Sequence, residues 1–322
     1  MSKYRRQLPQ LSGRPFLTDG GLETSLIFHE GIDLPFFASF DLLRTADGTA
    51  RIQRYYERYI EIAKRNRTGF VLEGATWRAN PDWGAKLGYS RDELAAANRA
   101  AVELMAKLRE VHESAETPMV ISANIGPRGD GYKIENAMTA AEAEDYHGWQ
   151  VDVFRDTEAD LVSAFTINYV EEAIGIARAC SRAGMLSVIS FTVETDGRLP
   201  SGQALRAAIE ECDRETRNVP AYYMINCAHP AHFADALREG KPWVKRLRGL
   251  RANASMRSHA ELDAATDLDI GDPADLGARY RGLCRQFGHF SVFGGCCGTD
   301  HRHVESIALA CLPAEAVREP AC

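Results

Sequence analysis

Short apolar runs rich in β-branched and aromatic residues recur along the chain, and longer stretches with a helical pattern separate them. The eight runs cover residues 15–20, 69–76, 118–126, 160–167, 186–193, 221–228, 248–255 and 290–298. Helix-like stretches between them include residues 46–66, 91–113 and 139–158. Continuous apolar strands that alternate with helices indicate a parallel sheet buried on both faces.

Eight such units in about 300 residues predict a (β/α)8 TIM barrel in a single domain. A doubly wound open sheet is the structural alternative. The first strand is followed by no G-x-G-x-x-G, and no P-loop is present, which counts against that alternative. We assign the barrel to residues 15–312, with an N-terminal extension (1–14) and a C-terminal tail (313–322).

Composition narrows the class of partner. The 322 residues are 45% hydrophobic and carry a formal net charge of −7, which argues against nucleic acid or a membrane surface and leaves small molecules. No apolar run reaches the length of a membrane span, and the basic start lacks the apolar core of a secretory signal. Eight cysteines are too few for a disulfide scaffold, so we expect a cytoplasmic protein with free thiols.

Three of the cysteines stand at the ends of predicted strands. Cys227 ends the sixth run, and Cys296 and Cys297 end the eighth. The other five fall in predicted helices or the tail: Cys180, Cys212, Cys284, Cys311 and Cys322. Because the chemistry of a TIM barrel gathers at the C-terminal ends of its strands, the first three are expected to lie close together.

Neighbouring side chains of a regular strand point to opposite faces, so two adjacent thiols share one site only if the backbone leaves strand geometry. Gly294, Gly295 and Gly298 around Cys296 and Cys297 permit this. A disulfide between neighbours would be strained, and the remaining alternative is that the cysteines fill apolar space. Three thiolates suit zinc, and this is the interpretation we favour.

The group that occupies the fourth coordination position of such a zinc site decides whether the site is structural or catalytic. His229, His301 or His303 could close it, which would make the site structural. An open position could instead bind a substrate thiol and hold it as the nucleophilic thiolate. A free thiol, with a pKa near 8.5, is mostly protonated at neutral pH.

On these residues the chain resembles the zinc-dependent homocysteine S-methyltransferases, which include enzymes dependent on betaine and on S-methylmethionine and the N-terminal part of cobalamin-dependent methionine synthase. The resemblance runs from about Phe16 to Ala308 and rests on "TDGGLETSL", "GATWRAN", "ANIGPRGDGY", "SFTVETDGRLPSGQAL", "INCAHP" and "GGCCGTDHRH". It implies a (β/α)8 barrel and zinc bound by Cys227, Cys296 and Cys297. It further implies methyl transfer to homocysteine, giving methionine.

The resemblance also implies substrate contacts. Asp19 and Gly20 would lie against homocysteine, and Asn226 would orient the loop of the zinc cysteine. The family usually carries Glu-Thr or Glu-Tyr at the end of strand four, where the Glu would bind the amino group of homocysteine. Here Phe165 stands in place of that Glu, followed by Thr166.

The missing negative charge must then come from elsewhere. Glu73 and Glu194 each stand near a strand end, and we favour Glu194.

The methyl donor must be a cation, a sulfonium or a quaternary ammonium, and aromatic faces and carboxylates suit it. The candidates are Trp77, Phe40, Phe191, Phe165, Asp19 and Glu23, of which Trp77 at the end of strand two is the most suggestive. The sequence does not distinguish between S-methylmethionine, S-adenosylmethionine and a betaine-type compound as the donor.

Other functions remain as alternatives at this point. A zinc hydrolase or lyase on the same barrel would need a base such as His229 or Glu194 over a zinc-bound water. The methyl acceptor could be a different thiol or a selenol. A non-catalytic zinc-binding or redox-sensing protein would show a closed site or reversible oxidation of Cys296 and Cys297.

Overall fold

The computed structural model describes residues 2–238 and 242–312. Within these residues eight parallel strands form a closed barrel in the order β1 to β8, which confirms the predicted (β/α)8 architecture. The strands are β1 (Phe16–Leu17), β2 (Gly69–Glu73), β3 (Met119–Ile125), β4 (Leu161–Ile167), β5 (Leu186–Phe191), β6 (Tyr222–Asn226), β7 (Leu247–Ala252) and β8 (Val292–Gly295). Each lies inside one of the eight predicted runs or starts within one residue of it.

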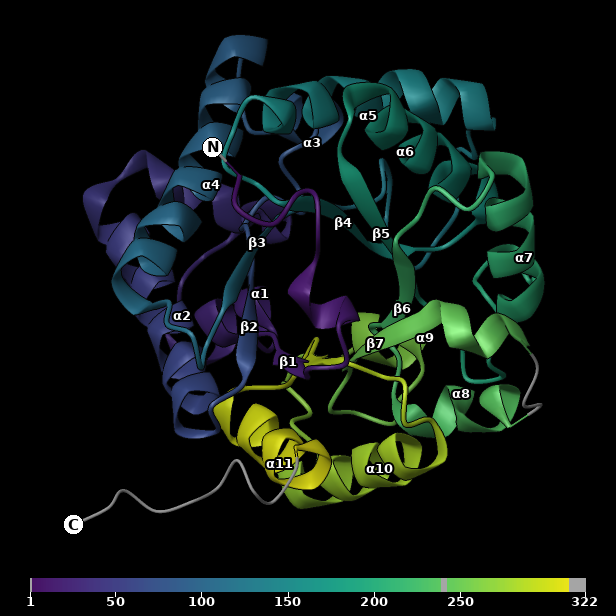
Figure 1. Cartoon of the computed structure of the whole chain (residues 1–322). Helices are drawn as coiled ribbons and strands as arrows, with labels where there is room; N and C mark the ends of the chain where they lie inside the picture. Colours follow the sequence, from purple (N-terminus) through teal and green to yellow (C-terminus); the bar gives the residue numbers. More distant parts are fainter. Residues whose placement is uncertain (1, 239–241, 313–322) are drawn as a thin grey trace.

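The longer helices surround the strands on the outside of the barrel (Figure 1). The α-helices are α1 (Leu22–Thr24), α2 (Ala46–Arg65), α3 (Pro81–Lys86), α4 (Arg91–His112), α5 (Ala140–Arg155), α6 (Val170–Ala183), α7 (Leu205–Thr216), α8 (Pro230–Leu237), α9 (His259–Asp263), α10 (Pro273–Gln286) and α11 (His301–Cys311). Short 3-10 helices cover Pro9–Leu11, Pro35–Phe37, Ser39–Arg44 and Pro242–Arg246, and Ser25–His29 forms a π-helical turn.

Local sequence signals set the helix ends. Ser90 and Glu93 form a capping box at the start of α4, and Thr139 and Glu142 form another at the start of α5. In each box two backbone N–H groups that lack helical partners are satisfied by side chains. Helix α6 ends at Gly184, which takes the left-handed conformation (φ 68°) that glycine adopts without strain.

Two apolar clusters hold the barrel together. Residues on the outer faces of the strands pack against the helices, and a second cluster fills the barrel interior. The interior cluster contains Phe16, Tyr222 and, near the C-terminal ends of the strands, Phe165. The barrel is therefore filled, and its chemistry is confined to the strand ends.

The segment predicted as an N-terminal extension, described here from residue 2 to residue 14, contacts the barrel interior. Leu8 belongs to the interior cluster, and the buried Gln10 lies 3.3 Å from the hydroxyl of Tyr222 through its Nε2. Figure 1 shows this segment crossing in front of the strands. The predicted tail, residues 313–322, lies outside the described residues.

Candidate metal centre

Three cysteine side chains meet at the C-terminal end of the barrel. Cys227 follows β6, and Cys296 and Cys297 follow β8. Their Sγ atoms lie within 4.8 Å of one another, and those of Cys227 and Cys297 are 4.0 Å apart. Cys227 is buried and the other two are partly buried. The arrangement presents three sulfur ligands to one point, as a tetrahedral zinc site requires.

Three thiols this close cannot all ionise in the protein alone. Hydrogen bonds from Cys296 and Cys297 lower the pKa of Cys227 well below its usual range. The hydrogen bond to Cys227 raises the pKa of Cys297 well above its usual range. A second and third thiolate therefore need a cation among the sulfurs, and the donor set fits a soft divalent metal such as zinc.

An asparagine fixes the backbone on which Cys227 sits. Cys227 (φ 52°) and Thr166 (φ 62°) both adopt the left-handed conformation, which is costly for residues with a Cβ atom. The side chain of Asn226 accepts from the Thr166 N–H (2.9 Å) and the Ser190 hydroxyl (2.7 Å) and donates to Thr166 Oγ1 (2.9 Å). The ends of β4, β5 and β6 are thus joined around one amide.

Glycines let the two adjacent cysteines approach. A Cβ at Gly294 would lie 2.0 Å from Thr18 Oγ1, and one at Gly295 would lie 2.0 Å from Thr299 Oγ1. Gly298 has φ 77° and completes the turn after Cys297. Only Gly298 supplies the positive φ expected from the sequence, whereas Gly294 and Gly295 are needed for close backbone approach.

A second layer of side chains holds the carbonyl of Cys227. His259 Nε2 lies 2.6 Å from this oxygen, and Asn253 Nδ2 donates to it over 3.1 Å. Glu194 Oε1 lies 3.0 Å from His259 Nδ1 on the other side of the ring. Tyr132 stacks on His259 with the ring centroids 3.9 Å apart, and its hydroxyl lies 3.8 Å from Cys297 Sγ.

A buried ion cluster lies beside the sulfurs. Arg251, the next-to-last residue of β7, places Nη2 2.8 Å from Asp19 Oδ1 and 3.0 Å from the carbonyl of Gly20. Its Nε donates to Gly295 O (2.9 Å). Burial lowers the pKa of Arg251, but Asp19 and Glu73 outweigh burial and raise it. The guanidinium therefore stays charged at the floor of the site.

The two carboxylates of the cluster differ in their partners. Asp19 Oδ2 accepts from the Tyr55 hydroxyl (3.0 Å), and Oδ1 pairs with Arg251. Glu73 Oε1 lies 4.0 Å from Arg251 Nη1, and Oε2 has no hydrogen-bond partner among the described residues. Burial raises the pKa of both, that of Glu73 to about 8.

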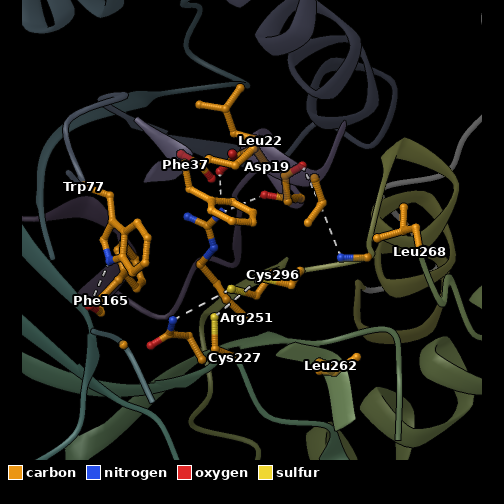
Figure 2. A pocket seen from close by; sticks show the side chains of 18 of the residues that line it. Asp19, Leu22, Phe37, Trp77, Phe165, Cys227, Arg251, Leu262, Leu268 and Cys296 are labelled. Atoms are coloured by element: carbon orange, nitrogen blue, oxygen red, sulfur yellow. Dashed lines mark hydrogen bonds and ion pairs between the residues drawn. The ribbon is translucent and has the colours of Figure 1, made fainter. Parts of the chain in front are cut away.

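The sulfurs and the ion cluster open into one cavity of about 350 Å³. Figure 2 shows Trp77 and Leu268 on opposite sides of it, with Cys296 between them. Aromatic side chains line its walls: Phe28, Phe37, Trp77, Tyr132 and Phe165. Besides Asp19, four aspartates line it: Asp130, Asp263, Asp267 and Asp269.

Most of the residues singled out in the sequence meet in this cavity. The lining includes Asp19, Gly20, Glu23, Trp77, Phe165, Asn226 and the three cysteines. Thr166 is buried behind the cavity, with Oγ1 3.6 Å from Cys227 Sγ. Glu194 is not among the lining residues, because its carboxylate is directed to His259.

Phe40 and Phe191 are buried in the apolar core, away from the cavity.

The histidines considered as closing ligands lie elsewhere. His229 caps α8 through a hydrogen bond from Ala231 N to Nδ1 (3.2 Å), and His303 lies between Asp300 and the Ile270 carbonyl. His301 is exposed at the start of α11. In the described part of the chain, no histidine lines the cavity.

Sequence reasoning missed the role of Arg251 and the cavity residues Arg78 and Tyr132. Arg251 carried a signal, since an arginine near the end of a buried barrel strand must have a partner. Arg78 follows Trp77 and lies over its ring, 4.0 Å from the centroid. Tyr132 comes from the loop after β3, and nothing in its local sequence marks it.

The comparisons with known proteins agree with the fold and identify a family. The family model described as Homocysteine S-methyltransferase matches residues 16–311. A comparison with curated protein sequences found no match. Solved structures of "Homocysteine Methyltransferase MmuM from Escherichia coli" in oxidized and metallated forms are each 18% identical. Both have a TM-score of 0.71 and cover 92% of this chain and 96% of that one. The apo form of the same protein gives a TM-score of 0.65.

At this identity, the structural likeness supports the fold alone. Within residues 2–238 and 242–312, no helix is long and apolar enough to cross a membrane.

Proposed function

Because the chain belongs to the homocysteine S-methyltransferase family, we propose that it is a zinc methyltransferase that moves a methyl group from a cationic donor to homocysteine. The observation that carries this proposal is the cluster of three cysteine sulfurs at the floor of the cavity. Zinc held by Cys227, Cys296 and Cys297 would keep a fourth position open and hold the acceptor sulfur there as a thiolate.

The protein around the sulfurs positions the acceptor. Asn226, Thr166 and His259 fix the backbone of Cys227, and the glycines fix that of Cys296. The acceptor sulfur would then bind at one defined position, with the rest of the acceptor extending over Arg251 and Glu73. Such positioning accounts for much of the rate enhancement when two reactants must meet in line.

The reaction is a displacement at carbon. The acceptor thiol releases its proton to solvent when it binds, and its sulfur attacks the methyl carbon of the donor. The new S–C bond forms as the C–S or C–N bond of the donor breaks, and the electron pair leaves with the donor. A sulfonium donor becomes a neutral thioether and a quaternary ammonium donor becomes a tertiary amine.

The cavity wall suits a cationic donor. Faces of Phe37 and Trp77 line it, and cations are attracted to aromatic faces. Four of the lining aspartates, Asp130, Asp263, Asp267 and Asp269, add negative charge, whereas arginines among the described lining residues number two, Arg78 and Arg251. This favours a sulfonium or quaternary ammonium donor over an anionic one. The roles of Asp19, Gly20 and Trp77 as substrate contacts are part of this proposal.

A hydrolytic function is less well supported. A hydrolase needs a base beside the metal-bound water. Neither base suggested by the sequence is available: no histidine is among the described residues that line the cavity, and Glu194 faces His259.

The test is the zinc content of the purified, reduced protein and its metal-edge absorption spectrum with and without homocysteine. We expect about one zinc per chain in a sulfur shell, one further sulfur ligand when homocysteine is added, and methionine formation with at least one cationic donor. A metal that ignores homocysteine would refute the acceptor, and a protein without zinc would refute the metal site.

A further inference from the structure

We propose that Glu73 and Arg251 bind the two charged groups of the acceptor: Glu73 takes the ammonium group and Arg251 takes the carboxylate. The inference rests on the proposed function and deepens it by naming the residues that select an amino-acid thiol. It assigns to β2 and β7 a task that the sequence had suggested for Glu194.

Glu194 cannot do this task from where it lies. Its carboxylate contacts His259 Nδ1 at 3.0 Å, and the far side of that ring faces the Cys227 carbonyl. Glu194 supports the loop of Cys227 from behind and lies outside the cavity lining. The acceptor must therefore find its negative partner elsewhere.

Asp19 lines the cavity, but its charge is already matched. Oδ1 forms an ion pair with Arg251 Nη2 at 2.8 Å, although it makes no hydrogen bond to a described residue, and Oδ2 accepts from Tyr55 at 3.0 Å. Glu73 is different. It is 3% exposed, its Oε2 has no hydrogen-bond partner among the described residues, and its Oε1 lies 4.0 Å from Arg251 Nη1, beyond hydrogen-bond reach.

A buried carboxylate oxygen without a hydrogen-bond partner destabilises the protein unless a ligand supplies that partner. Burial raises the pKa of Glu73 to about 8 and outweighs the lowering by Arg251 and by a hydrogen bond with Ser122, so the protein alone does not keep Glu73 ionised at neutral pH. An ammonium group on the acceptor would supply that charge. Among the carboxylates on the cavity floor, Glu73 is therefore the one that we expect to bind a cation.

Arg251 offers the complementary group. Nε and Nη2 are committed to Gly295 O, Gly20 O and Asp19, whereas Nη1 has no hydrogen bond to any described residue. Phe165 lies against the guanidinium, 4.9 Å from centroid to Cζ. The ring that replaces the expected glutamate therefore supports Arg251, whose Nη1 makes no hydrogen bond to Glu73 at 4.0 Å and can donate to a carboxylate.

The position of the pair matches the proposed metal centre. Arg251 pairs in register with Asn226 on β6 and with Gly294 on β8, the strands that precede the cysteines. An acceptor whose sulfur sits at those cysteines thus carries its α-carbon toward Arg251 and Glu73. A thiol with both charged groups satisfies both residues at once.

The experiment compares three thiols in which two methylene groups separate the sulfur from the carbon that corresponds to the α-carbon of homocysteine. Homocysteine carries both groups, 4-mercaptobutanoate lacks the ammonium, and 3-aminopropane-1-thiol lacks the carboxylate. Calorimetric titration of the zinc-loaded full chain measures each affinity without a methyl donor. We expect the wild-type protein to bind homocysteine about 10- to 100-fold more tightly than either analogue, because 4-mercaptobutanoate leaves Glu73 without its cation and 3-aminopropane-1-thiol leaves Arg251 Nη1 without its anion.

Glu73→Gln should remove the preference for homocysteine over 4-mercaptobutanoate and leave the affinity for 4-mercaptobutanoate within about twofold. Arg251→Lys should weaken both carboxylate-bearing thiols and spare 3-aminopropane-1-thiol. Glu23→Gln is the matched control, since that carboxylate also lines the cavity but is bonded to Ser39. It should keep the homocysteine preference.

Zinc content and thermal unfolding establish that each variant is folded, and Glu73→Gln carries the test if Arg251→Lys does not fold. Thiol binding with an unchanged homocysteine preference in Glu73→Gln would overturn this inference alone. If the zinc-loaded wild-type protein binds none of the three thiols, the proposed function fails and the inference fails with it.

Discussion

Thr166 and Cys227 face each other across the ends of β4 and β6, with Thr166 Oγ1 3.6 Å from Cys227 Sγ, and both have left-handed backbones. Such a conformation costs about 1–3 kcal/mol for each residue unless its surroundings enforce it. The side chain of Asn226 bonds to both the N–H and the hydroxyl of Thr166 and so holds the two strand ends together. The geometry of the metal centre thus depends on a residue that supplies no ligand.

Asn226→Ala should weaken metal binding by about 10- to 100-fold, the usual effect of removing a group that orients a ligand. Competition with a chelator measures the change. Ser190→Ala, which removes a single hydrogen bond to the same amide, is the control and should have a smaller effect. An Asn226→Ala protein with wild-type zinc affinity would contradict the orienting role.

Cys297→Ser should abolish activity and most zinc binding, because a serine hydroxyl does not replace a thiolate in the donor set. Metal analysis of the purified variant checks this. Cys284→Ser is the matched control, since Cys284 is also partly buried but lies on α10, outside the cavity. It should retain full zinc content. Retention of both zinc and activity in Cys297→Ser would refute the metal assignment.

Gly295→Ala should lower the free energy of unfolding by about 1–3 kcal/mol and disturb the metal site, because the added Cβ would meet the side chain of Thr299. Gly282→Ala provides the contrast. Gly282 lies in the exposed face of α10 with no atom within 4 Å of its Cβ position, so alanine should raise stability by about 0.5–1 kcal/mol. Denaturant unfolding of both variants measures the change in the free energy of unfolding, which should be negative for Gly295→Ala and positive for Gly282→Ala.

Asp300→Asn should reduce stability at neutral pH, and the difference from wild type should shrink as the pH falls below about 4. Burial raises the pKa of Asp300, but hydrogen bonds from His303 and Arg302 outweigh it and hold the pKa below its usual range. A depressed pKa stabilises the folded state above the unfolded-state pKa, and this contribution is lost on acidification.

Thermal unfolding from pH 3 to pH 7 checks this dependence on Asp300. A difference between variant and wild type that stays constant over this range would contradict the role of the charge at the start of α11.

The sequence was most informative where one physical signal dominates. Runs that are apolar throughout become strands buried on both faces, and all eight appear in the barrel. The cysteines could be grouped because parallel strands bring their C-terminal ends to one rim. The predicted strand ends overran, as at Thr18 to Gly20 after β1, because these polar rim residues follow the apolar pair Phe16–Leu17 directly and the sequence does not mark where the ladder ends.

Long side chains that cross the barrel mouth were less predictable. Arg251 reaches from β7 to Asp19 and Glu73, and no local pattern states how far a guanidinium extends or which carboxylate it meets. Glu194 and Glu73 both stand near strand ends, and the sequence favoured Glu194. Only the three-dimensional path of the chain after β5 turns Glu194 toward His259.

The short strand β1 and the position of the ligands after β8 have a consequence for how the protein is made. β8 pairs with β1 and closes the barrel, and Cys296 and Cys297 follow it directly. A growing polypeptide that has reached only residue 295 possesses a single ligand, Cys227. Acquisition of zinc at the proposed site must therefore be a late event in biosynthesis, after nearly the whole barrel has left the ribosome.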